Sequence, residues 1–250
     1  MSTPTTPSTD VAEPRRRRKP GTKPRLSRQG IIEAAFAVSE RDGAQALTFQ
    51  AIGAQLGAHP TAIYRYFRDK DELLLALLDA IHAEALAGAP EPTDDWAADL
   101  AELGRRTYAA FLRHPQVAQF AGARTARREN EFRKVDRVVG CMRTAGFEDA
   151  DAARYYRVFS DLILAHAALD ASLAALDPAT RAADLRSWDV EYRTLPADLF
   201  PDLAAVADHL PRVDDPGNFE LAMELMLDAL RMRAAAARSR RRPDDGRKRT

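Results

Sequence analysis

Cysteine is almost absent from this 250-residue sequence, in which Cys141 is the single one. One thiol can form neither an intrachain disulfide nor a cysteine-based metal cage, which fits a reducing, cytoplasmic compartment. Long apolar runs are also lacking: the longest, Leu73 to Leu78, falls far short of the roughly 18 residues that a membrane helix needs. The sequence therefore excludes disulfide-stapled classes and predicts no membrane partner.

Catalytic signatures are missing as well. The chain has no G-x-S-x-G, no P-loop and no G-x-G-x-x-G, and it lacks H-E-x-x-H, CxxC or a cluster of three histidines. We therefore predict no catalytic residues, no metal site and no cofactor. An all-α enzyme is kept as the weaker alternative.

Charge is abundant but unevenly distributed. The formal net charge is zero, yet residues 1–70 carry +6, residues 71–230 carry −13 and residues 231–250 carry +7. Such basic ends attract a polyanion that the acidic middle repels. The arginine runs at Arg15–Lys19 and Arg238–Arg242 are read either as arms that contact DNA or as solvated tails. They also motivate a third class, a non-specific architectural DNA-binding protein.

Strand-like alternation is absent, and the chain reads as all α. Residues 1–24 are rich in Thr, Pro and Arg and are expected to be disordered. A first helix is expected from a cap at Ser27 to about Asp42, and a second from a cap at Thr48 to about Leu56. A third begins at His59 and Pro60, and Asp69 with Glu72 forms the capping box of a fourth that reaches about Leu86.

The rest of the chain is also predicted to be helical, apart from an irregular stretch at residues 179–196, with a short helix around residues 182–187 as the alternative. The expected helices span residues 96–113, 127–145, 149–176, 199–210 and 218–237.

The stretch from Leu47 to Phe67 has the parts of a helix-turn-helix. Gly57 permits a tight turn between two short helices, and the apolar positions Ile52 and Ile63 leave the opposite faces free. The exposed face of the second helix can then enter a major groove. A surface hairpin with incidental basic and aromatic residues is the alternative on spacing alone.

The same residues resemble a known family. The segment LTFQAIGAQLGAHPTAIYRYFRDKDELL, Leu47 to Leu74, is similar to the signature of the TetR family of bacterial transcriptional repressors, and the preceding GIIEAAFAVSERDG fits that family's first helix. The resemblance covers Arg25 to Ala80, about a fifth of the chain. Two positions depart from the pattern: Ser39 stands where a core Phe is common, and His59 replaces a frequent Ser.

The resemblance implies a homodimer in which each N-terminal domain reads half of a palindromic double-stranded DNA operator, and each C-terminal domain holds a small-molecule effector pocket. Carried over position by position, Thr48 and Gln50 touch a phosphate or a base, and Pro60, Thr61 and Tyr64 meet the major groove. Arg65, Tyr66 and Lys70 contact the DNA backbone, and His59 stands at the start of the recognition helix. The implied DNA-binding residues are Thr48, Gln50, His59, Pro60, Thr61, Tyr64, Arg65, Tyr66 and Lys70.

The family's C-terminal domain varies, so the dimer surface and the pocket are read from the residues themselves. The long helix from Asp149 is apolar on more than one face, and the last helix carries a stripe that contains Phe219, Met223, Met226 and Leu230. The resemblance implies a four-helix dimer interface, and the apolar faces make these two helices its candidates, with packing inside one subunit as the alternative.

Aromatic and polar residues of this domain are the pocket candidates, although aromatic residues at helical spacing are more often core. The effector candidates are Trp96, Tyr108, Phe111, Phe120, Met142, Tyr156 and His166. His166 and Asp170, one turn apart, are read as a locally bonded pair more readily than as a ligand or metal site.

The sequence thus predicts a cytoplasmic repressor, nucleoid-associated when bound to DNA, that a ligand releases from its operator. Its expected parts are a disordered basic arm at 1–24, a DNA-binding domain at 25–72, a ligand-binding and dimerisation domain at 73–237 entered through the fourth helix, and a basic tail at 238–250.

Overall fold

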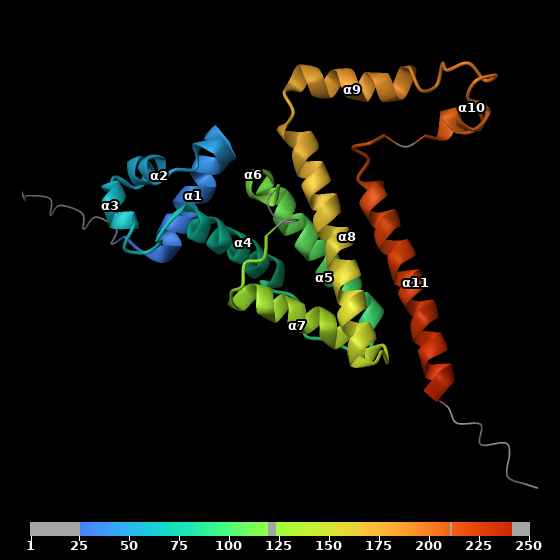
Figure 1. The fold of residues 1–250 in the computed structure, drawn as a ribbon, viewed down its shortest axis with the longest axis horizontal. Coiled ribbons are helices and arrows are strands. Elements are labelled where there is room, and N and C mark those ends of the chain that lie inside the picture. The colour runs from blue at the N-terminus through green and yellow to red at the C-terminus, as the bar shows by residue number, and fades with distance from the viewer. Residues whose placement is uncertain (1–25, 120–123, 211, 242–250) are drawn as a thin grey trace, which may run out of the picture.

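The computed structural model describes residues 26–119, 124–210 and 212–241 of the chain, and these residues form helices and turns but no strand (Figure 1). The all-α prediction is confirmed. The helices are α1 Arg28–Asp42, α2 Phe49–Leu56, α3 Pro60–Ile63, α4 Lys70–Leu86, α5 Trp96–Arg113, α6 Pro115–Ala118, α7 Glu129–Thr144, α8 Asp149–Ala175, α9 Pro178–Val190, α10 Pro201–Val206 and α11 Gly217–Arg241, with short 3-10 turns η1 Ala44–Ala46 and η3 Ala207–His209.

The first helices begin and end where their local signals place them. The Ser27 hydroxyl accepts a hydrogen bond from the Gly30 amide, and the Thr48 hydroxyl accepts one from the Ala51 amide. Gly57 ends α2 with φ 61° and ψ 31°, a left-handed conformation that favours glycine. These caps satisfy amide groups that have no partner inside the helix.

The expected capping box at the start of α4 is only half formed. Asp69 accepts from the Glu72 amide at 2.8 Å, as predicted. The Glu72 carboxylate does not return to the Asp69 amide, however, and accepts from the Arg68 amide at 2.9 Å instead. The other oxygen of the same carboxylate contacts Arg28 of α1 and lies near Arg128 before α7. Backbone hydrogen bonding lowers the pKa of both acids, Asp69 chiefly through the Glu72 amide and Glu72 chiefly through the Arg68 amide.

Two later helix starts differ from the prediction. Helix α7 starts at Glu129 and not at residue 127, because Arg127 has φ 54°, which a right-handed helix does not accept. Asp149 lies inside the first turn of α8 rather than at its cap, which is the extended residue Glu148.

The stretch from 179 to 196 was wrongly predicted to be irregular. It holds most of α9, a 13-residue helix whose start Asp177 caps by accepting from the Ala179 and Thr180 amides, with Pro178 in the first turn. The sequence Asp-Pro marks a helix start as well as a helix stop, and here it does both. At the other end of the domain, α11 continues past residue 237 to Arg241, so the predicted tail begins in helix. The predicted arm at 1–24 and the remainder of the tail lie outside the described residues.

One hydrophobic core joins the first four helices to the end of the bundle. Ile31, Ile52, Ile63 and Phe67 are fully buried in it, which confirms the inward face predicted for Ile52 and Ile63. Phe111 near the end of α5 belongs to the same cluster, as do residues of α6 and the last third of α8. Helix α4 therefore carries the small N-terminal group of helices on the side of the larger bundle (Figure 1).

A second core cluster lies between α5, α7, α8 and α11. Phe219, Met223 and Leu230 of α11 are buried in it, at 2%, 0% and 2% exposure, so this stripe packs inside its own subunit. For these residues the alternative, packing inside one subunit, is confirmed, and a dimer interface on α8 and α11 would have to use their other faces. Sequence spacing shows that one face of a helix is apolar, but not which neighbour covers it.

Helix α8 is long and apolar enough to meet a length-and-composition test for a membrane span, a point that the sequence prediction missed. It packs against α5, α6 and α7, and only 28% of its most apolar 18-residue segment is buried. Val158 and Leu169 are about half exposed on its outer side. Helix α11 runs antiparallel to α8 in Figure 1 and also exposes apolar residues, Leu221, Leu225 and Met232.

Candidate nucleic-acid interface and interior pocket

Helices α2 and α3 meet at a close backbone approach. The α2 residue Gly53 is buried, and the Ala58 amide donates to its carbonyl oxygen at 2.9 Å. A side chain at Gly53 would strike the turn, since a Cβ there would lie 2.7 Å from the Ala58 oxygen. The two glycines at 53 and 57 therefore let α3 cross α2 tightly and present its outer face. This is the geometry of a helix-turn-helix.

Most of the residues implied in DNA binding share this outer surface. Thr48, Gln50, His59, Thr61, Tyr64, Arg65 and Lys70 are exposed, and Pro60 and Tyr66 are half-buried. A hollow of about 820 Å³ opens between α2 and α3. Tyr64, 58% exposed, stands at its edge with its ring against Phe49 at a centroid distance of 4.8 Å. Tyr64 is thus exposed to a partner while its contact with the buried Phe49 fixes its orientation.

His59 caps the start of α3, the role expected of the Ser that is frequent at this position. Its backbone is extended, and its Nδ1 accepts from the Thr61 amide at 3.3 Å and lies 2.8 Å from the Thr61 hydroxyl. A side chain that accepts from an amide of the first turn is an N-cap, the role in which Ser is favoured. The substitution therefore keeps the start of α3, and it adds an imidazole to the exposed surface.

Tyr66 is held by the protein itself. Its hydroxyl donates to the Leu26 carbonyl oxygen at 2.6 Å, and its own carbonyl accepts from Arg28 Nη1 at 2.8 Å. The Arg28 guanidinium also lies 4.2 Å from the centre of the Phe67 ring. These contacts attach the chain after α3 to the start of α1. Tyr66 therefore helps to fix the position of α3 against α1.

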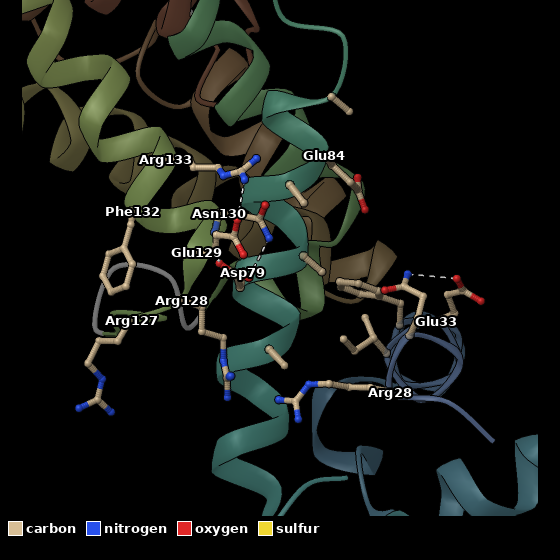
Figure 2. A pocket seen from close by; sticks show the side chains of 17 residues that line it. Arg28, Glu33, Asp79, Glu84, Arg127, Arg128, Glu129, Asn130, Phe132 and Arg133 are labelled. Atoms are coloured by element: carbon tan, nitrogen blue, oxygen red, sulfur yellow. Dashed lines mark hydrogen bonds and ion pairs between the residues drawn. The ribbon is translucent and has the colours of Figure 1, made fainter.

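Glu72 connects the N-terminal helices to α7. Its carboxylate accepts from Arg28 of α1 at 3.3 Å and lies 3.7 Å from Arg128, which precedes α7. Figure 2 shows both arginines reaching toward α4, from opposite sides of a surface groove of about 950 Å³. Further up α4, Asp79 accepts from the backbone amides of Asn130 and Glu131, each at 3.0 Å. Helix α4 is thus hydrogen-bonded at two levels to the beginning of α7.

His114, between α5 and α6, forms another bridge. Its two ring nitrogens lie 2.9 Å from Glu40 of α1 and 2.8 Å from Glu84 of α4, and the ring stacks on Phe36 at 4.0 Å. The sequence reading identified none of these bridges, because each depends on residues far apart in the chain.

An interior pocket of about 330 Å³ lies between α4, α5, α7 and α8. Of the residues predicted to bind an effector, Phe111 and Tyr156 line it, whereas Trp96, Tyr108, Met142 and His166 do not, and Phe120 lies outside the described residues. Met142 is fully buried in the second core cluster, against which Trp96 packs. The structure therefore supports the general expectation that aromatic residues at helical spacing belong to cores.

Tyr108 and His166 instead surround Phe219. The Tyr108 ring stacks on Phe219 at 3.8 Å, and the His166 ring meets it edge-on at 5.8 Å. The Tyr108 hydroxyl donates to Asp170, so this carboxylate binds Tyr108 rather than the neighbouring His166. Burial, followed by this hydrogen bond, raises the pKa of Tyr108.

Two titratable residues of the pocket were missed by the sequence reading. Burial lowers the pKa of His82 to about 3, and burial lowers that of Lys134 to about 8. Both are nearly inaccessible, at 4% and 5% exposure. Their positions on α4 and α7 follow helical spacing, but only the packing of four helices shows that they are interior.

A helix-turn-helix with an exposed reading face, joined by one helix to a bundle that holds a pocket, defines a DNA-binding regulator. Two family descriptions match: "Bacterial regulatory proteins, tetR family" over residues 31–77, and "Tetracyclin repressor-like, C-terminal domain" over residues 89–234. The chain belongs to the TetR family of transcriptional regulators.

Individual relatives agree with this assignment. The HTH-type transcriptional repressor DrrR1 of Streptomyces coeruleorubidus is 24% identical over 91% of this chain and 86% of its own. An HTH-type transcriptional regulator of Saccharopolyspora erythraea is 30% identical over 70% of this chain and 75% of its own. The crystal structure of ActR from Streptomyces coelicolor in complex with actinorhodin is 26% identical, with a TM-score of 0.73, over 84% of this chain and 99% of that one. These are transcriptional regulators, and the enzyme alternative finds no support among them.

Proposed function

We propose that the protein is a homodimeric repressor that binds a palindromic DNA operator and is released from it by a small molecule. The observation that carries the proposal is the single helix α4. It begins beside the exposed reading surface and ends among the helices that enclose the interior pocket. We propose α4 as the connecting helix between a DNA-binding domain at 25–72 and a ligand-binding and dimerisation domain from 73, which α11 extends to Arg241.

At the DNA, the proposed contacts divide into two groups. Pro60, Thr61 and Tyr64 of the α3 region meet the major groove, while Arg65 and Lys70 bind phosphates. Thr48 and Gln50 at the start of α2 add a phosphate or base contact, and His59 contributes its exposed ring. Tyr66 is proposed to position α3 and not to bind DNA through its hydroxyl, because this group already donates to the Leu26 carbonyl oxygen.

The dimer is proposed to form through the outer faces of α8 and α11. Val158 and Leu169 of α8 and Leu221 and Leu225 of α11 are 50% to 62% exposed, although they are large and apolar. A second copy would cover them and complete a four-helix interface. This replaces the Phe219 stripe, which is buried within one subunit.

Release follows from a difference in effector affinity between two arrangements of α4. A ligand that favours one arrangement of the pocket over another shifts the separation of the two reading heads and their match to successive major grooves. ActR, a TetR family protein solved in complex with actinorhodin, supports the expectation that a small molecule binds within this fold. Before release the protein is nucleoid-associated, and afterwards it is free in the cytoplasm.

Selection of bound sequences from a random double-stranded DNA pool tests the proposal. We expect enrichment of one palindrome by the full-length protein. Binding without sequence preference would instead favour the architectural alternative, and a selected asymmetric site would contradict a dimeric reader.

A further inference from the structure

The interior pocket is lined by a nearly buried lysine for which no ion-pair partner lies among the described residues. Lys134 of α7 is 5% exposed and lines the cavity. Two other cations border the same space, and each has a carboxylate: Arg124 binds Asp71 at 2.6 Å, and Arg157 binds Asp161 at 2.7 Å. Lys134 forms no hydrogen bond or ion pair with the residues that the structure describes. An ammonium group with little access to water and no ion-pair partner is costly, and a bound anion would stabilise it.

One carboxylate of the same helix is hydrogen-bonded to backbone amides and acts on Lys134 through its charge, without an ion pair. Glu131, one turn before Lys134, accepts from the Ala126 amide at 3.2 Å and from the Arg127 amide at 2.7 Å. It raises the pKa of Lys134 against the larger effect of burial, and the resulting value of about 8 leaves the amine mostly protonated at pH 7. The positive charge is therefore present in the pocket under ordinary conditions.

A second unpartnered atom belongs to His82, another residue that lines the pocket. His82 Nδ1 of α4 is buried and has no hydrogen-bond partner, while Nε2 is 4.0 Å from Glu131. The ring is neutral at pH 7 because its pKa is low. A proton on Nε2 faces the carboxylate favourably, and this tautomer leaves Nδ1 as an acceptor. Nδ1 is closed to water as the ring now lies, so a hydroxyl or an N–H of a bound molecule satisfies this acceptor when the ring turns toward the cavity.

Apolar groups provide the remaining walls. Phe111, Tyr156, Leu78 and Leu164 come from three helices around the cavity. At about 330 Å³ the cavity is at the small end of the range for ligand pockets, which suits a compact molecule.

We infer that the effector is a compact aromatic hydroxy acid whose carboxylate or phenolate binds Lys134 and whose hydroxyl donates to His82 Nδ1. The inference rests on the proposed function, in which this pocket is the effector site. The anion would lie one turn from the hydrogen bonds through which Asp79 fixes Asn130 and Glu131. A ligand at Lys134 therefore acts close to the joint between α4 and α7.

The test uses four probes of one shape with the full-length protein: 3-hydroxy-2-naphthoate, its methyl ester, 2-naphthoate and 2-naphthylmethylamine. Titration calorimetry at pH 7 measures binding without DNA. We expect the hydroxy acid to bind about tenfold or more tightly than its ester, because a charge-assisted hydrogen bond is replaced by a neutral one. We expect 2-naphthoate to bind more weakly than the hydroxy acid and the amine not to bind.

Two variants locate the effect. Lys134→Met should remove the preference for acid over ester while it keeps a folded protein, because the substitution takes away an uncompensated buried charge. Arg133→Met, which changes the exposed neighbour, should keep the preference. His82→Phe should make the hydroxy acid and 2-naphthoate bind alike.

Equal binding of acid and ester by the unmodified protein, or an unchanged preference in a folded Lys134→Met, would overturn the inference. Its failure is separable from that of the proposed function, because selection of a DNA palindrome does not depend on these probes. Preference for the amine would also contradict it.

Discussion

Gly53 and Ala58 hold the two DNA-reading helices at a distance that leaves no room for a side chain. A methyl group on Gly53 would stand 2.7 Å from the Ala58 carbonyl oxygen, which is backbone and cannot swing away. We therefore expect Gly53→Ala to displace α3 and to reduce operator affinity by at least tenfold.

Gly140 provides the matched control. It lies within α7 with no atom near its Cβ position. Gly140→Ala should leave DNA binding unchanged and raise stability by about 0.5–1 kcal/mol, the usual gain in a helix interior. Mobility-shift titrations and thermal denaturation of both variants make the comparison. Equal operator affinity of Gly53→Ala and the unmodified protein would contradict the tight crossing.

Asp79 gives the second prediction, which concerns communication between pocket and reader. Asp79→Ala removes the acceptor that fixes the start of α7 to α4, and loss of such a cap costs about 1 kcal/mol. We expect a modestly lower melting temperature, nearly unchanged operator affinity, and weaker release by an effector. Asp136→Ala, at an exposed position of α7, is the control. Full release by an effector in Asp79→Ala would show that this contact does not couple the two sites.

The dependence of stability on pH should reveal the lowered pKa of the buried His82. Its pKa is near 3 in the folded chain and about 6.5 in the unfolded chain, so between these values the unfolded state binds more protons. Stability is therefore lost as the pH falls below about 6.5. At pH 5 this residue alone should cost on the order of 2 kcal/mol.

Urea denaturation at pH 7 and pH 5 checks this expectation. His82→Phe should lose less stability than the unmodified protein over this interval, because it lacks the proton uptake. A substitution of the exposed His209 serves as the control. Parallel losses in His82→Phe and the unmodified protein would contradict the buried, neutral state of His82.

Replacement of Lys70 and of Thr61 by alanine should change DNA binding in two different ways. Lys70→Ala is expected to weaken binding to all sequences and to lower the salt dependence by about one counter-ion per contact. Thr61→Ala is expected to change which base is preferred at one position of each half-site, by about 1–3 kcal/mol. Mobility shifts at several salt concentrations, with operator variants, separate the two. A change in base preference in Lys70→Ala, with no change in Thr61→Ala, would reverse the assignment.

The sequence predicts those parts of the structure that depend on neighbouring residues. Ser27, Thr48 and Gly57 act at helix ends as expected because a cap or a left-handed glycine works within one turn of chain. The helix-turn-helix is recognisable for the same reason. Its exposed residues, including the capping role of His59, follow once the two helices are placed.

Tertiary packing decides what sequence spacing leaves open. An apolar stripe that contains Phe219 and Met223 could cover a partner or its own subunit, and the structure shows the second. Lys134 and His82 appear in the sequence as ordinary polar residues on amphipathic helices, and their burial arises only where four helices meet. The pocket prediction relied on aromatic residues, so it found two wall residues and missed the polar groups.

The central claim is that two copies of the chain read one DNA site through α3, and base-pair scanning of the selected operator tests it most directly. Each base pair is replaced in turn, and the affinity of the full-length protein and its sedimentation stoichiometry are measured. The account predicts two copies per site and losses of about 1–3 kcal/mol at positions that are symmetric about the centre of the operator. Losses confined to one side of the site, or a uniform response to every substitution, would contradict it.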